Sequence, residues 1–456
     1  MFQVGDDYAH PFEADSLMNA VSFIDGRAYY RSRFVQTEGY QEEQAAGKRL
    51  YRGFSNLPGG WLKNVFNVKF KNPANTNAVY HGNKLLALWE AGLPHALDPL
   101  TLETIALDDL GILTRQEGPN KEPFSAHPIL DPESKCLVNF GSTGLKTRVM
   151  EFDDKLELVR DKMFDFSRWS MTHDFGVTQR YYTFYQGAFG FNIPAWVLGR
   201  EMAQALHYDK AIGSQFLLVP RDGDGPEVTI PCPDPGFSFH IANSYDCAET
   251  GDVVVDLVEC EGMAIGVDLG KDSQGRPKPL WEMDYGRDAA NSALVRYRLN
   301  TTTGECSKVP LLENYCDFVT INSNYTTKKH RFIYASIGSD TTKASPLQGL
   351  VKVDAETGES SLWFPEPHQF LSEPAWADKA GSGNDQEEDD GYLMTFLFDG
   401  KDMRSEVVLF DAKDITKGPI CRMGLRNFVP HGLHGTFCGK AIYTVEEIKA
   451  AFQKVA

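Results

Sequence analysis

Four of the eleven histidines in this 456-residue chain occur in a context that the others lack. They are His127 in Ser-Ala-His-Pro, His173 in Met-Thr-His-Asp-Phe-Gly, His240 in Phe-His-Ile-Ala-Asn and His434 in Gly-Leu-His-Gly-Thr-Phe. Each lies at the end of an apolar, strand-forming run beside Gly, Pro or Asn, where a ring can project toward neighbouring strand ends. Four imidazoles that met at one point would form a metal site. For any one of them alone, a hydrogen-bonded core or surface position is the commoner role.

The strands that would position these histidines are predicted to be short and numerous. Forty glycines and 24 prolines punctuate the chain, and aromatic residues make up 12% of it, which favours many short strands over long helices. Residues 20–34 alternate apolar and polar side chains across Gly26, the pattern of a β-hairpin. Residues 77–89 predict a strand, a turn and a second strand, and residues 42–50 predict a short helical connector.

A short turn motif recurs along the chain and predicts its architecture. Asp or Asn stands at the first corner of a tight turn between strand-forming residues at Asp98, Asp131, Asn300, Asp354 and Asp411. Hairpins repeated at irregular spacings favour a radial arrangement, a β-propeller of four-stranded blades, over an array of β-sandwiches. Because the inner strands of propeller blades surround one axis, histidines far apart in the sequence can meet there.

Charge and cysteine usage exclude some classes of protein. The formal net charge of −18 and the lack of Lys and Arg clusters argue against binding to nucleic acid. The eight cysteines are scattered without a Cys-x-x-Cys pair, which predicts free thiols in a reducing compartment. No signal-peptide pattern or bilayer-spanning run is found. We therefore expect a soluble protein of the cytoplasm, with the plastid stroma as the alternative.

Taken together, the four histidine motifs resemble those of the carotenoid cleavage oxygenases, a family that also includes retinoid isomerases and stilbene-cleaving dioxygenases. The resemblance runs from Pro11 to Gly439, and Ser-Ala-His-Pro, Met-Thr-His-Asp-Phe-Gly, Phe-His-x-x-Asn and Gly-x-His-Gly-Thr-Phe occur in the family's order. It implies an all-β fold, a seven-bladed β-propeller that occupies residues 1–456 as one domain. Helical and loop segments, at about residues 186–212 and 378–391, are expected to cap the axial metal site.

The resemblance also implies a ferrous ion on the propeller axis, with His127, His173, His240 and His434 as its ligands. Four neutral imidazoles without a thiolate or carboxylate leave the charge of the ion at +2, which favours Fe(II) over Fe(III). Coordination positions remain for dioxygen. Zinc would prefer a closed tetrahedral site and offers no redox route to activate O₂.

In the family, carboxylates hydrogen-bond the second ring nitrogen of three ligands and orient the rings. By motif, Glu90 in Leu-Trp-Glu-Ala-Gly and Glu373 in Ser-Glu-Pro-Ala-Trp fall on two of these positions, where they would serve His173 and His434. At the third position, where relatives carry Glu, this chain has Asp317. Its side chain is one methylene shorter, so a water bridge or a shifted backbone would have to join it to His240. The alternative is that Asp317 is an acid in a strand-end turn.

The N-terminus is a second departure from the family pattern. Relatives begin with a longer segment and an early strand, whereas residues 11–21 follow almost at once here. Propellers usually close by pairing a terminal strand into the last blade. The sequence therefore predicts a shortened form, or another strand in the closing position.

The implied function is the oxidative cleavage of a conjugated carbon–carbon double bond of a carotenoid or apocarotenoid by O₂, giving two carbonyl products. Trp89, Phe239 and Phe437 are candidate walls of the apolar tunnel that would hold the substrate, although a core role is common for such side chains. Stilbene-cleaving relatives tend to carry lysine where this chain has Trp89, which favours a carotenoid substrate. A stilbene-cleaving dioxygenase, an isomerase and a non-catalytic lipid-binding propeller with an impaired iron site remain alternatives.

Two segments interrupt the strand pattern. Residues 193–208 carry apolar residues at helical spacing, and Trp196 and Leu198 are predicted to be exposed. This segment is either a helix packed on the sheet or an apolar patch, Ile193 to Leu198, that touches a membrane surface and admits an apolar substrate. Residues 380–390 are rich in Asp and Glu and predict a solvated loop.

Overall fold

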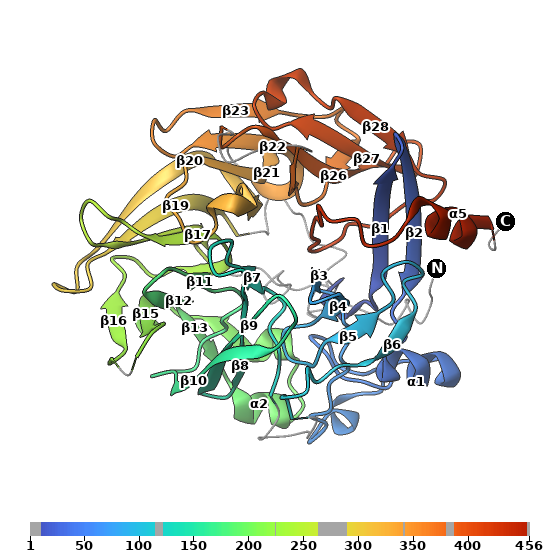
Figure 1. The fold of residues 1–456 in the computed structure, drawn as a ribbon. Coiled ribbons are helices and arrows are strands. Elements are labelled where there is room, and N and C mark those ends of the chain that lie inside the picture. The colour runs from blue at the N-terminus through green and yellow to red at the C-terminus, as the bar shows by residue number, and fades with distance from the viewer. Residues whose placement is uncertain are drawn as a thin grey trace.

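Antiparallel strands dominate the computed structural model, which describes residues 11–114, 122–223, 225–262, 290–340, 343–379 and 387–453. The sheets stand around a ring, with their inner strands toward its middle (Figure 1). The predicted all-β fold with a propeller-like arrangement is therefore confirmed. No helix among the described residues has the length and apolarity needed to cross a membrane.

Three sheets of four strands occupy the first half of the ring. The first contains β3 (Asn77–His81), β4 (Lys84–Leu88), β5 (His95–Leu97) and β6 (Thr104–Leu107), and the second β7 (Ile129–Leu130), β8 (Leu137–Thr143), β9 (Lys146–Phe152) and β10 (Leu158–Asp165). The third contains β11 (Gly176–Val177), β12 (Tyr181–Gln186), β15 (Gln215–Pro220) and β16 (Val228–Pro231). Successive strands of a sheet pair with each other, as hairpin connections require.

A seven-stranded sheet and a five-stranded sheet follow around the ring. The seven strands are β17 (Phe237–Asp246), β18 (Val253–Cys260), β19 (Ser292–Leu299), β20 (Cys306–Thr320), β21 (Phe332–Asp340), β22 (Lys343–Asp354) and β23 (Ser360–Trp363). The five strands are β24 (Gln369–Leu371), β25 (Ala375–Asp378), β26 (Gly391–Asp399), β27 (Arg404–Asp411) and β28 (Cys421–Gly424). The long β20 pairs with β19 through its first part and with β21 through its last part, so it joins two four-stranded units.

Two small hairpins and short helices complete the described residues. The hairpins are β1 (Leu17–Ile24) with β2 (Arg27–Phe34), and β13 (Phe189–Phe191) with β14 (Leu206–Tyr208). The α-helices are α1 (Glu38–Ala46), α2 (Ile193–Val197), α3 (Met202–Ala205) and α5 (Val445–Gln453). Single 3-10 turns lie at Pro11–Glu13, Trp61–Lys63, Lys210–Ile212, Ser323–Tyr325 and Ile415–Lys417.

The recurrent Asp and Asn turns form as the sequence predicts. The Oδ1 atom of Asp98 accepts hydrogen bonds from the backbone N–H groups of Leu100, at 2.9 Å, and Thr101, at 2.7 Å. The equivalent side chains accept backbone N–H groups two residues onward in the other four turns, at Asp131, Asn300, Asp354 and Asp411. These side chains replace ladder hydrogen bonds where the chain reverses, which is why the motif marks hairpins.

The core lies between adjacent sheets. Phe140 of β8 meets Phe175 and Phe184, from the next sheet, at ring-centroid distances of 4.9 and 5.4 Å. All three rings are buried. Such face-to-face packing holds the sheets at fixed positions around the ring and leaves their inner strand ends free to carry a site.

The predicted elements agree with the structure except in two places. The hairpins at residues 20–34 and 77–89 are confirmed, and all eight cysteines are free. The helical connector predicted at residues 42–50 lies closer to the N-terminus in the structure, where it is α1. This helix begins at Glu38, because the Thr37 side chain accepts the N–H of Tyr40 and caps the helix. Residues 186–212 are more ordered than a loop, since they hold β13, β14, α2 and α3.

The prediction that Trp196 is exposed is wrong. Its side chain is 8% exposed, because the indole stacks on Phe70 with ring centroids 5.4 Å apart and lies under the Arg52 guanidinium. Leu198, by contrast, is 59% exposed, as predicted. The acidic loop at residues 380–390 falls mostly outside the described residues, since the structure describes only its last four.

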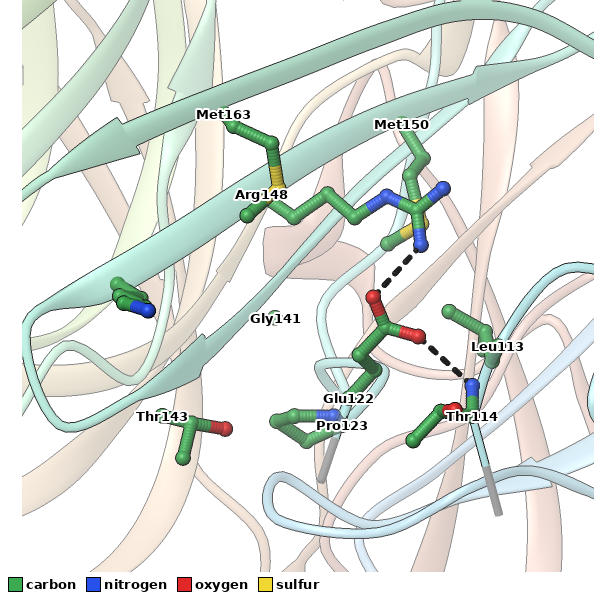
Figure 2. A pocket seen from close by; sticks show the side chains of 10 residues that line it. Leu113, Thr114, Glu122, Pro123, Gly141, Thr143, Arg148, Met150 and Met163 are labelled. Carbon is green, nitrogen blue, oxygen red and sulfur yellow. Dashed lines mark hydrogen bonds and ion pairs between the residues drawn. The ribbon is translucent and has the colours of Figure 1, made fainter. Parts of the chain in front are cut away.

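A hollow of about 260 Å³ is lined by residues of the second sheet and of the segment before it (Figure 2). Arg148 of β9 crosses it and donates to Glu122 at 3.0 Å and to Asp161 of β10 at 2.8 Å. Glu122 in turn accepts the backbone N–H of Thr114 at 2.7 Å. The hydrogen bonds of Arg148 and Glu122 therefore join the segment before the second sheet to β9 and β10, and we call this link the structural joint.

At the floor of this joint, Gly141 of β8 faces the carbonyl oxygen of Pro123, and a Cβ atom at this glycine would lie 1.8 Å from that oxygen. We expect Gly141→Ala to lower the free energy of unfolding by about 1–3 kcal/mol, because backbone atoms must move apart. Gly424→Ala in β28 is the matched control, since a Cβ there meets nothing within 4 Å. Urea unfolding followed by tryptophan fluorescence measures both. Equal midpoints for the two variants would contradict this account of the joint.

Candidate metal centre

The four predicted histidines converge, although they come from four separate parts of the chain. His127 precedes β7, His173 precedes β11, His240 lies within β17, and His434 follows β28 in the C-terminal segment. Their potential ligand nitrogens all lie within 4.8 Å of one another. Among the described residues, this group meets the spacing needed to hold a metal ion.

Local backbone structure aims each ring. The pairing of β17 with β18 shifts register on both sides of Ile241, and such a bulge bends a strand and redirects a side chain, here that of the neighbouring His240. The backbone N–H of His434 donates to the carbonyl of Thr76 at 3.0 Å, which ties the C-terminal segment to the start of the first sheet. The N–H of His127 donates to Ser125 Oγ at 3.3 Å.

The ring nitrogens meet through their Nε2 atoms. Those of His127 and His173 are 2.8 Å apart, and those of His240 and His434 are 3.1 Å apart. Two nitrogens that bind one ion at right angles, each at about 2.1 Å, are separated by about 3.0 Å. The observed spacings therefore match pairs of adjacent ligands on a single first-row metal ion, and the donor set of four imidazoles fits such an ion.

Three of the four rings present Nδ1 to a carboxylate. Glu90 contacts His173, Asp317 Oδ1 lies 2.5 Å from His240, and Glu373 Oε1 lies 2.7 Å from His434. The second oxygen of Glu373 accepts the backbone N–H of Gly435 at 2.9 Å. A carboxylate on Nδ1 fixes the tautomer that leaves Nε2 free to bind a metal.

Asp317 reaches His240 directly, at a place where the backbone of β20 is irregular. The pairing of β20 with β21 shifts register between Asp317 and Thr320, and Phe318, the next residue, adopts a left-handed conformation with φ 54°. Asp317 Oδ1 also accepts the N–H of Phe318 at 2.8 Å. Of the two ways predicted to bridge the gap, the geometry corresponds to the shifted backbone.

Burial and neighbouring charges shift the pKa values of the histidines and of the acids that face them. Burial, reinforced by the neighbouring imidazoles, holds the pKa of His127 well below its ordinary value, so the ring is neutral and able to bind a metal. Burial also lowers the pKa of His434, against the pull of Glu373. For Glu90 and Asp317 burial acts to raise the pKa, but the adjacent histidines outweigh it and both pKa values lie below the ordinary range. These carboxylates are therefore ionised near neutral pH.

Of the three aromatic residues predicted to line a tunnel, Phe239 contacts the cluster. Its ring lies edge-on to His173 with a centroid distance of 5.2 Å. Trp89 immediately precedes Glu90, and Phe437 follows His434 by three residues; both are half-buried. Their place in a tunnel stays a prediction.

Two neighbours of the cluster were not predicted. The ring of Phe318 lies 5.2 Å from that of His240 and 5.3 Å from that of His434. Asp174, directly after His173, accepts the backbone N–H of Ile241 at 2.8 Å, and burial raises its pKa to about 6. Both residues stand inside the histidine motifs or beside Asp317, so adjacency in sequence was the available signal. Their orientation depends on the bulges in β17 and β20.

Comparison with known proteins gives consistent matches. The family model described as retinal pigment epithelial membrane protein matches residues 1–439. The apocarotenoid-15,15'-oxygenase of Synechocystis sp. is 36% identical over 451 residues, covering 96% of this chain and 88% of that protein. A carotenoid 9,10(9',10')-cleavage dioxygenase of Crocus sativus is 28% identical, covering 94% and 80%. The crystal structure of cobalt-substituted Synechocystis ACO has a TM-score of 0.84 at 34% identity, covering 93% and 88%.

Removing one ring should empty the centre. We expect His240→Ala to purify without bound metal, because the cluster loses one of its four imidazoles and Asp317 loses its partner. His368→Ala is the control, since that histidine is 39% exposed and lies outside the cluster. Metal analysis by plasma emission gives the iron content of both. One equivalent of iron in His240→Ala would contradict the assignment.

Proposed function

The chain belongs to the family of the retinal pigment epithelial membrane protein and the carotenoid cleavage oxygenases, and we propose that it is a non-haem Fe(II) dioxygenase acting on an apocarotenoid or carotenoid. The reaction cleaves one conjugated carbon–carbon double bond and places one oxygen atom of O₂ on each of two carbonyl products. The observation that carries the proposal is the convergence of four imidazoles, three of them backed by carboxylates.

We assign the ligand role to His127, His173, His240 and His434, and the orienting role to Glu90, Asp317 and Glu373. An iron(II) ion held there would supply the redox chemistry that lets O₂ react with a polyene. The protein's own part is positional. The carboxylates hold the rings with Nε2 inward, and the rings of Phe239 and Phe318 cover the cluster and exclude water from its surroundings.

The substrate side is assigned to apolar surface near the cluster. An apolar conjugated chain would run past Phe239 and Phe318, with Trp89 and Phe437 as further walls, and the shape of the tunnel would select the scissile bond. The relatives named for apocarotenoid and carotenoid cleavage support this substrate class. Trp89 beside Glu90 supports it too, because an indole offers no ammonium to a phenolic substrate.

We further propose that the ring has seven blades and that β1 and β2 supply the seventh. The hairpin stands between the first sheet and the five-stranded sheet (Figure 1). Arg33 of β2 pairs with Glu103 at 2.9 Å on one side, and Ser22 of β1 hydrogen-bonds Tyr443 of the C-terminal segment at 2.6 Å on the other. A two-stranded blade bonded to the first sheet's segment and to the C-terminal segment would fill the place between the two sheets.

We propose a peripheral membrane contact through an apolar patch wider than Ile193 to Leu198. The residues of this patch are strongly exposed: Trp61, Leu62, Phe66, Val68, Ile193 and Leu198. They belong to two segments that lie side by side, since the N–H of Phe66 donates to the carbonyl of Val197 at 2.8 Å. Arg52 fixes both segments by donating to the carbonyls of Asn64 and Trp196. Exposed apolar patches of this kind dock on lipid and admit apolar substrates.

The free cysteines support a reducing compartment, the cytoplasm or the plastid stroma, for a protein that touches membranes from the aqueous side.

The reaction can be tested with the purified, iron-loaded protein. We expect an apocarotenal to give two carbonyl products by mass spectrometry, each with one ¹⁸O atom when the reaction runs under ¹⁸O₂ and is trapped before exchange with water. A hydroxystilbene is the comparison substrate, and His434→Ala without iron is the control. Cleavage of the stilbene alone would move the protein to the stilbene-cleaving class. Isomerised product without oxygen uptake, or no turnover by protein with full iron, would contradict the dioxygenase proposal.

The patch can be tested by flotation with phosphatidylcholine vesicles. We expect Leu62→Ser with Phe66→Ser to lower the partition coefficient at least about tenfold, because each side chain contributes about 1.5–3 kcal/mol when transferred out of water. Ile105→Ser in β6 is the control, since Ile105 is 67% exposed but lies outside the patch. Equal partitioning by the double variant and the unsubstituted protein would contradict the membrane contact.

A further inference from the structure

His173 and His240 stand in different sheets, and their separation must be set by contacts between those sheets. His173 precedes β11 of the third sheet, whereas His240 lies in β17 of the seven-stranded sheet. Among the described strands, no ladder of backbone hydrogen bonds joins β11 to β17. The two rings are nevertheless only 5.4 Å apart between centroids. Something other than strand pairing must hold these backbones in register.

The Asp174 carboxylate makes that connection. Its Oδ1 accepts the N–H of Phe175 at 2.7 Å, and its Oδ2 accepts the N–H of Ile241 at 2.8 Å. Asp174 directly follows His173, and Ile241 directly follows His240. One side chain therefore bridges the residues that come immediately after two of the proposed ligands, across the boundary between two sheets.

The bulge in β17 makes this bridge possible. The register of β17 against β18 shifts on both sides of Ile241, so the strand there departs from regular pairing. The N–H of Ile241 points to Asp174. A buried N–H without an acceptor is costly, so the carboxylate stabilises the same irregular backbone that aims His240.

The strands β11, β12 and β17 next to Asp174 are packed closely, so its hydrogen bonds can shift little. A Cβ atom on Gly176 would lie 1.9 Å from Ser244 Oγ of β17 and 2.4 Å from Thr183 Oγ1 of β12. Those two hydroxyl oxygens are themselves 3.1 Å apart. Glycine is needed at this position for the third sheet to approach β17, and the approach brings Asp174 within reach of Ile241.

We propose that Asp174 is a positioning residue of the metal centre, whose carboxylate sets the distance and relative orientation of His173 and His240 by accepting N–H groups from both sides of the sheet boundary. The inference rests on the proposed function, since it assumes that these two histidines bind the ion. Asp174 acts through the backbone and not as a ligand.

The chemistry of the side chain suggests the test. A carboxylate offers acceptors on both oxygens, whereas an amide offers one acceptor and one donor. In Asp174→Asn, one of the two N–H groups must face an NH₂ group, so one of the two hydrogen bonds is lost while the side-chain volume stays the same. Glu388→Gln is a matched control, because Glu388 also accepts two backbone N–H groups, from Arg331 at 2.8 Å and Phe332 at 2.7 Å, remote from the histidines.

The measurement is Co(II) binding by the metal-free full-length protein, with affinity from chelator competition and geometry from the electron paramagnetic resonance spectrum of the bound ion. We expect Asp174→Asn to bind Co(II) about 10–100-fold more weakly with a changed spectrum, the range for groups that orient metal ligands. We expect Glu388→Gln to keep both the affinity and the spectrum. Thermal unfolding of the metal-free proteins checks that both variants are folded.

An unchanged affinity and spectrum in folded Asp174→Asn would overturn the proposal. If that variant does not fold, Asp174→Glu decides, because it keeps two acceptors and displaces them by one methylene; a changed Co(II) spectrum supports positioning and an unchanged one overturns it. Failure of the unsubstituted protein to bind Co(II) or Fe(II) would instead overturn the proposed metal centre, so the two failures are distinguishable.

Discussion

The structure depends on one demanding arrangement: four imidazoles removed from water and aimed at a common point from four parts of the chain. Desolvation favours the neutral ring, which is the form that binds metals. A neutral imidazole in an apolar interior still needs a partner for Nδ1, and Glu90, Asp317 and Glu373 provide it. Glu90 follows β4, Asp317 lies within β20, and Glu373 lies between β24 and β25. The ring of sheets is therefore constrained to bring both the histidines and their acids to one place.

Regular strands cannot satisfy this constraint alone, and the backbone is irregular where the site is built. β17 is bulged around Ile241 and β20 after Asp317, and Phe318 carries a left-handed conformation that costs energy for a bulky residue. Two carboxylates stabilise these irregularities, since Asp174 accepts the N–H of Ile241 in β17 and Asp317 accepts the N–H of Phe318 in β20. The side chains that surround the proposed ion thus also secure the backbone that presents its ligands.

Much of the fold and the membership of the histidine cluster could be predicted from sequence because their signals are local. An Asp at the corner of a hairpin caps its own backbone, and a histidine motif is a contiguous string. The features that the sequence did not predict depend on contacts between residues far apart in the chain. Trp196 has the look of an exposed apolar residue, but Phe70 and Arg52, more than a hundred positions away, bury it. The direct contact of Asp317 with His240 could not be judged from side-chain length alone, because it also depends on the irregular backbone of β20.

The negative charges of the buried acids explain why the site would favour a bound cation. Glu90 and Asp317 are held ionised by the histidines they face, and Asp317 raises the pKa of His240 although burial acts to lower it. Negative charge buried at this level requires positive charge nearby. A divalent ion bound at Nε2 supplies it while the imidazoles stay neutral; a proton on His240 is the competing source. A metal ion and protons would therefore compete for the same ring nitrogens. The carboxylates that orient the rings also affect how strongly each of the two binds.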